Sequence, residues 1–191
     1  ALGVPWPAAM TYGELLSSLD PHQPGPAALL TLATRLLRGA GYTAFDGAPP
    51  AIEIHSAVAA PYAHCTAPLR RLADRYVLET CLALCAGEPV PTWVRAALPL
   101  LPQEMAEADR RANALDRAVV DLAEAVAMHT RVGESFDGVV VESSAKGGTV
   151  QLADPAVRGR LAAADPPLGH RVRVRLVEAD PSARSVRFAL V

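Results

Sequence analysis

The sequence predicts an α+β protein in which a mainly helical part is followed by a small five-stranded β-barrel. Up to about residue 130, apolar residues recur every three or four positions, which is the spacing of amphipathic helices. From Gly133 onward the composition changes to short runs rich in β-branched residues, separated by Gly, Pro and Asp. Five such runs in about 55 residues favour a barrel. We therefore place a domain boundary between residues 131 and 132.

The composition is that of a globular protein, because 51% of the 191 residues are hydrophobic and 20% are charged. The net charge of −2 gives no general attraction to polyanions. Any contact with nucleic acid must therefore come from local basic patches. Lys146 is the only lysine among 18 basic residues. Arginine suits bidentate phosphate contacts, but the same bias is typical of a GC-rich genome.

The three cysteines lack the spacing of a zinc site or a disulfide framework. We therefore expect Cys81 and Cys85 to be small core residues of a cytoplasmic protein. No apolar run is long enough to span a bilayer and no signal peptide is recognisable, so we expect no membrane partner. The first residue is Ala1 and not Met, which leaves open whether the chain is processed, trimmed or partial.

The helical part contains several elements that local signals define. A short helix is expected at Tyr12–Leu19 and a longer one at Pro26–Arg38, where prolines precede the apolar face and glycines follow it. Ala51–Val58 has the length and the β-branched content of a strand and carries His55. A further short helix is expected around Trp93–Leu98.

The longest periodic element runs from Gln103 to Met128. Seven apolar residues alternate steps of three and four along it: Met105, Ala108, Ala112, Leu115, Val119, Leu122 and Val126. Because no flanking repeat continues this seam, it predicts a long helix packed on its own domain in a monomeric protein. A protein–protein interaction module that uses this helix is an alternative.

The most informative stretch is the motif segment, Tyr62–Val77. Thr66 is expected to cap a helix that runs from Ala67 to Ala86, with Pro68 in its first turn. Its apolar stripe would comprise Leu69, Leu72, Ala73, Tyr76 and Val77. Arg70 and Arg71 would then stand in the opening turns, where free backbone amides favour anions. The simpler alternative is an exposed ion pair between Arg70 and Asp74.

The motif segment closely resembles the signature of the ribonuclease II and ribonuclease R family, Tyr-x-His-Phe-Thr-Ser-Pro-Ile-Arg-Arg-Tyr-x-Asp. Seven residues fall on it: Tyr62, His64, Thr66, Pro68, Arg70, Arg71 and Asp74. Four depart from it, namely Cys65, Ala67, Leu69 and Leu72, which indicates a divergent branch. Weaker similarities to the family lie in the segment Thr34–Tyr42, at His55 and in the pair Asp116-Arg117.

The resemblance implies that residues 1–131 are the C-terminal part of an RNB-type catalytic domain and that residues 132–191 are an OB-fold RNA-binding barrel. The family consists of 3′-to-5′ exoribonucleases that hydrolyse single-stranded RNA to nucleotides with a divalent metal, here expected to be Mg²⁺. In the family an aspartate cluster upstream of the signature holds this metal, and no such cluster precedes Tyr62. We therefore expect the metal ligands to lie in an upstream half of the catalytic domain. This chain alone would be inactive.

By the same resemblance, Arg70 is the candidate catalytic residue, because it would brace a phosphate at the reacting 3′ end. Five further residues are expected to bind RNA in the catalytic part: Tyr62, His64, Thr66, Arg71 and Asp116. A non-catalytic RNA-binding module derived from the same family is an alternative, which the substitutions at Cys65, Ala67 and Leu72 favour.

The barrel is expected to bind RNA through Arg171, Arg173 and Arg175. Its strands are predicted at Ser135–Ser143, Gly148–Leu152, Arg158–Leu161, His170–Asp180 and Ser185–Val191. Because side chains alternate along a strand, the three guanidiniums would share one face and could follow a single-stranded backbone. Only Phe136 and Phe188 could stack on bases, and either can be a core residue. We therefore expect modest, salt-sensitive and non-specific affinity.

Overall fold

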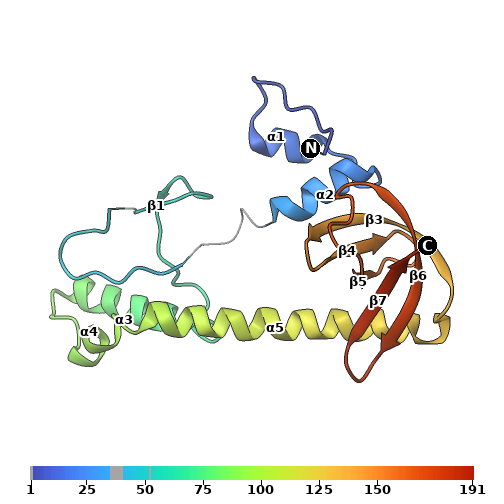
Figure 1. Cartoon of the computed structure of the whole chain (residues 1–191). Coiled ribbons are helices and arrows are strands. Elements are labelled where there is room, and N and C mark those ends of the chain that lie inside the picture. Colours follow the sequence, from blue (N-terminus) through green and yellow to red (C-terminus); the bar gives the residue numbers. More distant parts are fainter. Residues whose placement is uncertain (1, 35–40, 52) are drawn as a thin grey trace. The chain divides into compact units, whose positions relative to one another are not determined.

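The computed structural model describes residues 2–34, 41–51 and 53–191. Its fold is the predicted one, helices followed by a closed five-stranded barrel. The chain divides into two compact units (Figure 1). The barrel unit comprises Ala1–Gly39 and Leu115–Val191, and the motif unit comprises Ala40–Ala114. These units do not test a boundary along the sequence, so the division between residues 131 and 132 stays a prediction.

Two short helices precede the barrel within the barrel unit. Helix α1, Tyr12–Ser18, begins with a capping box in which Thr11 and Glu14 satisfy each other's backbone amides. Helix α2, Pro24–Ala33, begins two residues before the predicted start and packs against the first barrel strand. The predicted extension to Arg38 falls on residues 35–38, which lie outside the described residues, as do residues 35–40 of the family-like segment Thr34–Tyr42.

Helix α5, Leu101–Met128, confirms the long predicted helix and continues into a 3₁₀ turn at His129–Arg131. The C-terminal end of α5 is anchored, because Ala125 and Met128 are completely buried in the barrel core. The predicted packing of its heptad seam is wrong beyond Met105, because the other six seam residues are exposed. Four of them are between 42% and 65% exposed: Leu115, Val119, Leu122 and Val126. The periodicity defined the helix but could not tell what covers its apolar face.

The barrel strands are β3 (Ser135–Ser144), β4 (Gly147–Leu152), β5 (Arg158–Leu161), β6 (Arg171–Asp180) and β7 (Ser185–Leu190). They close in the order β3-β4-β5-β7-β6. All neighbouring strands are antiparallel except β5 and β7, which run parallel. This is an OB-like barrel. Each strand lies within one residue of its predicted bounds, because period-two alternation and turn residues define both the strands and their ends.

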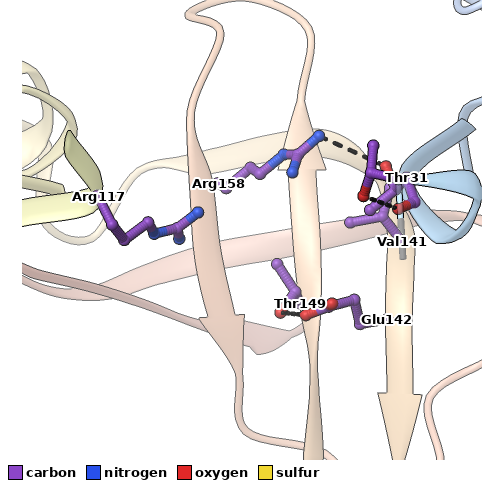
Figure 2. Close-up of a pocket in the computed structure, with 7 residues that line it drawn as sticks. Thr31, Arg117, Val141, Glu142, Thr149 and Arg158 are labelled. Atoms are coloured by element: carbon purple, nitrogen blue, oxygen red, sulfur yellow. Dashed lines mark hydrogen bonds between the residues drawn. The ribbon is translucent and has the colours of Figure 1, made fainter. Parts of the chain in front are cut away.

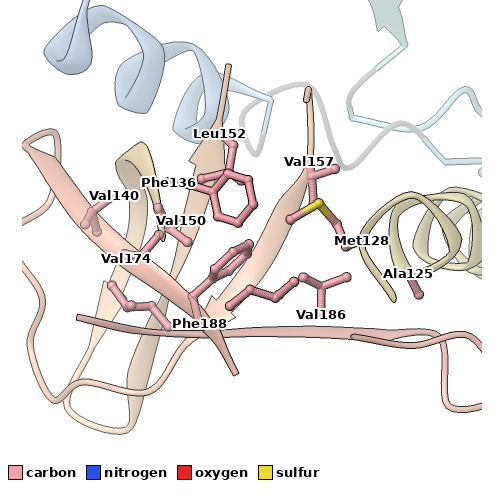
Figure 3. Packing of buried hydrophobic residues seen from close by; sticks show 12 residues of the cluster. Ala125, Met128, Phe136, Val140, Val150, Leu152, Val157, Val174, Val186 and Phe188 are labelled. Carbon is pink, nitrogen blue, oxygen red and sulfur yellow. The ribbon is translucent and has the colours of Figure 1, made fainter. Parts of the chain in front are cut away.

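The barrel core is filled by the inward residues of every strand together with the end of α5 (Figure 3). Phe136 and Phe188 meet edge to face with ring centroids 6.3 Å apart, and both are buried. Gly159 is required beside them, since a Cβ there would lie 2.4 Å from a carbon of the Phe188 ring. The barrel's two aromatic side chains are therefore core residues and are not available to stack on bases.

The motif unit begins with a minimal hairpin of β1 (Ile54–His55) and β2 (Ala60–Pro61). The strand predicted at Ala51–Val58 is too long, because the backbone turns directly after His55 and reaches a left-handed conformation at Ala59. Helix α3, Leu72–Ala86, ends at the left-handed Gly87. Helix α4, Thr92–Ala97, packs against it through Trp93 and Tyr76, whose ring centroids lie 5.4 Å apart.

Cys81 and Cys85 are exposed on α3, so their predicted place in a core is wrong. A spacing of four residues places two side chains on one helix face but does not reveal whether that face is inward. Among the helices of the described part of the chain, none combines the length and the apolar character needed to cross a membrane.

Candidate functional site

The motif segment does not fold as one helix from Thr66. Helix α3 begins only at Leu72, with Arg71 as its N-cap in an extended conformation. The residues before it form a separate turn, in which the amides of Arg70 and Arg71 both donate to the carbonyl of Ala67, at 3.1 and 3.0 Å. The predicted capping role of Thr66 and the place of Pro68 in the first helical turn are therefore wrong. Both arginines precede the helix.

The buried carboxylate of Asp74 explains this arrangement. Asp74 Oδ2 accepts the backbone amide of Ala67 at 2.6 Å, and the Arg71 guanidinium donates to both carboxylate oxygens at 2.9–3.1 Å. A fully buried carboxylate needs such partners. The Arg71 side chain, and next the Ala67 amide, hold the pKa of Asp74 below its ordinary value against the opposing effect of burial. Asp74 lies in the first turn of helix α3 and thus fixes the turn that precedes this helix.

The two arginines of the motif segment have different environments. Arg71 also donates to Thr66 Oγ1 at 3.2 Å, and its hydrogen bonds to Asp74 raise its pKa. The alternative of an Arg70–Asp74 ion pair is wrong, because Arg71 takes that carboxylate. Arg70 is exposed, and its side chain has no hydrogen-bond or ion-pair partner within the described ranges. Arg71 fixes the turn, whereas Arg70 remains available for an anion.

The predicted apolar stripe of the motif segment is only partly buried. Ala73 is buried, and Tyr76 and Val77 are half-buried. Leu69 is completely exposed and Leu72 is 47% exposed, so their predicted burial is wrong. Leu69 lies in the separate turn and not on the helix, which removes it from the helical face.

Four rings gather in the same unit: Tyr42, His55, Tyr62 and His64. Neighbouring ring centroids lie 5.1–5.7 Å apart, and His64 Nδ1 is 3.2 Å from the Tyr62 hydroxyl. Burial raises the pKa of Tyr42, and the charge of Arg71 opposes that rise. Sequence reasoning assigned no role to Tyr42, whose only signal was its place at the end of the weak family similarity before the motif.

Asp116 lies on α5, within the barrel unit, and is exposed. The neighbouring Arg117 forms an ion pair with Asp121 at 2.9 Å. The predicted site residues of the helical part therefore belong to different units: Tyr62, His64, Thr66, Arg70 and Arg71 to the motif unit, and Asp116 to the barrel unit. Their assignment to catalysis or RNA binding stays a prediction.

The three barrel arginines do lie on the outer face of β6, alternating with Val174 and Leu176, which are completely buried. Their charges are not equally available. Arg173 Nη1 donates to both carboxylate oxygens of Asp137 at 3.0 Å, and Arg171 Nη2 donates to the His22 carbonyl at 3.2 Å. Arg175 has no side-chain partner among the residues described. Asp137 faces Arg173 because β3 pairs with β6 in that register, which the sequence alone did not reveal.

No group of three or more metal-ligating side chains occurs within residues 2–34, 41–51 and 53–191. The residues described here therefore do not fit the Mg²⁺ site that the family resemblance implies. We assign no chemical step in this chain to a metal.

Residues 134–191 match a family model, the C-terminal S1 domain of RNase II-type exonucleases. The match covers all five strands of the barrel, β3 to β7. Three solved structures of Mycoplasma genitalium RNase R are similar to the whole chain. The apo form and a complex with ribose-methylated single-stranded RNA each have a TM-score of 0.71 at 14% identity, covering 98% of this chain. A complex with double-stranded RNA has a TM-score of 0.67 at 16% identity, covering 96% of this chain.

At these identities the likeness shows the fold. The helical part and the S1 barrel together have the fold of the C-terminal part of RNase R, which confirms the fold implied by the motif segment. The chain spans about a third of the length of these structures, 31–33%. None of the curated protein sequences matches it.

Proposed function

We propose that this chain is the C-terminal part of a cytoplasmic 3′-to-5′ exoribonuclease of the RNase R type, and that Arg70 binds a phosphate at the reacting end of single-stranded RNA. One observation carries the proposal. Asp74 takes Arg71 as its partner, which leaves Arg70 exposed and without a partner in the part of the chain that the structure describes, beside the turn that Asp74 fixes. The S1 domain at residues 134–191 and the RNase R fold support the same assignment.

The chemistry of this site follows from the groups present. The guanidinium of Arg70 can donate two parallel hydrogen bonds to phosphate oxygens and stabilise the charge that builds on them during hydrolysis. Arg71, Asp74 and Thr66 hold the turn and so position Arg70. Mg²⁺ is part of the proposal through the family resemblance only, with its ligands in an upstream half of the catalytic domain.

The test compares Arg70→Ala with Arg75→Ala in the full-length enzyme that would contain this chain. Arg75 is an exposed arginine of α3 a turn away and serves as the matched control. Arg70→Ala should lower kcat for single-stranded RNA about 10²- to 10³-fold, as the loss of one transition-state donor does. Arg75→Ala should have little effect. Equal kcat values in the two variants would refute the role of Arg70.

The isolated chain should not hydrolyse RNA. If residues 1–191 degrade single-stranded RNA with Mg²⁺ or Mn²⁺ and the Arg70→Ala variant does not, the proposed dependence on an upstream half is wrong. If the native protein has the size of this chain and binds RNA without degrading it, the non-catalytic RNA-binding module is the better function.

The exposed seam of α5 favours a partner for this helix. Leu115, Val119, Leu122 and Val126 form one apolar face that the described residues leave open. We propose that the upstream half of the catalytic domain covers it, because about two thirds of the matched RNase R chains has no counterpart here. Sedimentation of the chain then gives a monomer. A concentration-dependent dimer would instead support the protein–protein interaction module.

A further inference from the structure

Helix α3 presents an apolar face to solvent. Leu78, Cys81, Leu82 and Cys85 follow one another at steps of three, one and three, so they share one face of the helix. Leu78 is 43% exposed, Leu82 is 67% exposed, and both cysteines are exposed. The face of a helix that meets water is normally polar, whereas this one carries no charged residue. We call these four residues the α3 stripe.

The rest of the helix is almost as apolar as the stripe. Between Val77 and Ala86 only Glu79 and Thr80 are polar. The Thr80 hydroxyl donates to the backbone carbonyl of Tyr76 at 2.8 Å, so it is satisfied within the helix. A helix that is hydrophobic nearly all round is typical of a protein interior. The sequence of α3 therefore suits a helix that is covered on more sides than it is in this chain.

The motif unit, to which α3 belongs, has few buried side chains of its own. Its residues 40–114 comprise a segment of the size of a small domain, which needs a hydrophobic core to be stable. Among its described residues only five hydrophobic side chains are buried, and two of them are alanines: Ala73, Ala83, Val94, Leu101 and Met105. The motif unit thus has part of a core and lacks the rest.

The barrel unit, in contrast, has a core of its own, to which every strand contributes. The polar pocket between α2, α5 and strands β3–β5 is also held by contacts within this unit (Figure 2). There Arg158 donates to Gln151 at 2.9 Å and to Thr31 at 3.4 Å, and Arg117 pairs with Asp121. The need for additional polypeptide is therefore greatest at the motif unit.

The chemistry of the α3 stripe fits an apolar polypeptide surface. Two leucines and two thiols have no group that would bind a phosphate, whereas their burial against apolar side chains is favourable. The first RNase R structures that match this chain contain about two thirds of a chain without a counterpart here, since the match covers 33% of them. The missing polypeptide of an RNase R-type enzyme is thus large enough to complete the core of the motif unit.

We propose that the upstream half of the catalytic domain docks on the α3 stripe and buries Cys81 and Cys85. This inference rests on the proposed function, in which such an upstream half exists. It concerns a surface other than the exposed seam of α5, because α3 lies in the motif unit and that seam in the barrel unit. The two thiols are then small apolar residues of a shared core, which alkylating reagents do not reach.

The test compares thiol alkylation by iodoacetamide in the 191-residue chain and in the full-length enzyme. Peptide mass spectrometry follows Cys81 and Cys85 separately. A cysteine introduced by Ser182→Cys serves as the reference thiol, because Ser182 lies in the exposed turn between β6 and β7, outside the proposed interface.

In the 191-residue chain, Cys81 and Cys85 should react within a few-fold of the reference thiol. In the full-length enzyme they should react about 100-fold more slowly, because alkylation then requires the interface to open. The reference thiol should react at the same rate in both proteins. Equal rates for Cys81 and Cys85 in the two proteins would refute the docking.

Two leucine variants of the full-length enzyme locate the interface. Leu82→Asp should raise the alkylation rates of both thiols about 10-fold or more, because it places a charge in the α3 stripe. Leu84→Asp is the matched control, since Leu84 is 66% exposed on the same helix but lies two residues along, near the opposite side. It should leave the thiols protected. Equal release by the two variants would show a general loosening and would refute docking on the stripe.

The outcomes separate this inference from the proposed function. If the full-length enzyme degrades RNA and depends on Arg70, but Cys81 and Cys85 remain reactive in it, only this inference fails. If the native protein has the size of this chain, both fail, because no upstream half exists. If the thiols are protected in the 191-residue chain and become reactive on dilution, a second copy covers the α3 stripe and the docking of an upstream half is wrong.

Discussion

Arginine side chains have different partners on the barrel surface and in the motif segment. On the barrel, Arg173 and Arg187 each lie against a carboxylate of a neighbouring strand, and both phenylalanine rings are turned into the core. In the motif segment the buried carboxylate of Asp74 takes Arg71, and Arg70 has no side-chain partner among the described residues. Tyr62 is nearly half exposed there and touches two histidine rings.

This difference separates two tasks. A surface on which two of the arginines are neutralised by carboxylates, and whose two phenylalanine rings are buried, suits weak contacts along an RNA backbone. A guanidinium without a partner among the described residues, next to a turn that fixes its backbone, suits a single contact with a phosphate. Under the proposed function, the motif unit would orient one phosphate and the barrel unit would supply general affinity for RNA.

The largest expected effect concerns the barrel's ring pair. Phe188→Ala should lower the free energy of unfolding by about 3–5 kcal/mol, since Phe188 is completely buried and its removal leaves a cavity beside Phe136. The measurement is denaturant unfolding of the chain. Phe45→Ala is the control, because Phe45 is exposed and its loss should change stability by about 0.5 kcal/mol or less. Similar losses in both variants would show that the ring pair does not organise the barrel.

Gly159→Ala should destabilise the barrel by about 1–3 kcal/mol. The added Cβ would lie 2.4 Å from the Phe188 ring and force it from its place. Gly13→Ala is a suitable control, since no atom lies within 4 Å of a Cβ built there. If Gly159→Ala leaves the free energy of unfolding unchanged, the core can accommodate the added Cβ and the prediction is wrong.

The motif segment should respond to acid through Asp74. Asp74 has its pKa lowered from 3.8 by the Arg71 and Ala67 hydrogen bonds. A carboxylate whose folded pKa is depressed contributes stability that is present above pH 3.8 and is lost as the pH falls through the lower, folded pKa. We expect the hydrogen-exchange protection of the Ala67 amide to disappear in that acid range. Asp74→Asn should abolish this pH dependence, and a variant with unchanged dependence would contradict the assignment.

The smallest effects concern the β6 arginines. Arg175→Gln should weaken RNA binding about 3- to 10-fold. Arg175 has no partner among the described residues, so it can bind a phosphate without first breaking an ion pair. Arg173→Gln should weaken RNA binding less, since Asp137 already neutralises Arg173. Anisotropy titrations at low salt compare the two directly. Equal losses would show that the Asp137 pair opens when RNA binds.

The sequence predicted the barrel closely because its information is local. Each strand of β3–β7 alternates inward and outward residues, and each turn carries Gly, Pro or Asp, so no distant contact was needed. Helix α5 was predicted for the same reason. The exposure of its apolar seam was not predicted, because the periodicity of a helix shows that it has an apolar face but not what covers that face.

The candidate site was harder to predict because its geometry depends on one contact across seven residues. Thr66 and Pro68 are good local signals for a helix start, yet the Asp74 carboxylate bonds the Ala67 amide and keeps the turn apart from α3. The family resemblance identified Arg70 and Arg71 but could not say which of them Asp74 would take. Tyr42 was missed since it joins the ring cluster only through the fold.

The position of β7 in the barrel has a consequence for synthesis. Strand β7 lies between β5 and β6 and is the last of the five to leave the ribosome. Until Ser185–Leu190 emerges, the edge of β5 stays unpaired and the nascent sheet cannot close. Ribosome pausing within this strand should therefore expose the half-built barrel to aggregation. Slow codons before Ser185 should lower the yield of folded protein more than slow codons within α1.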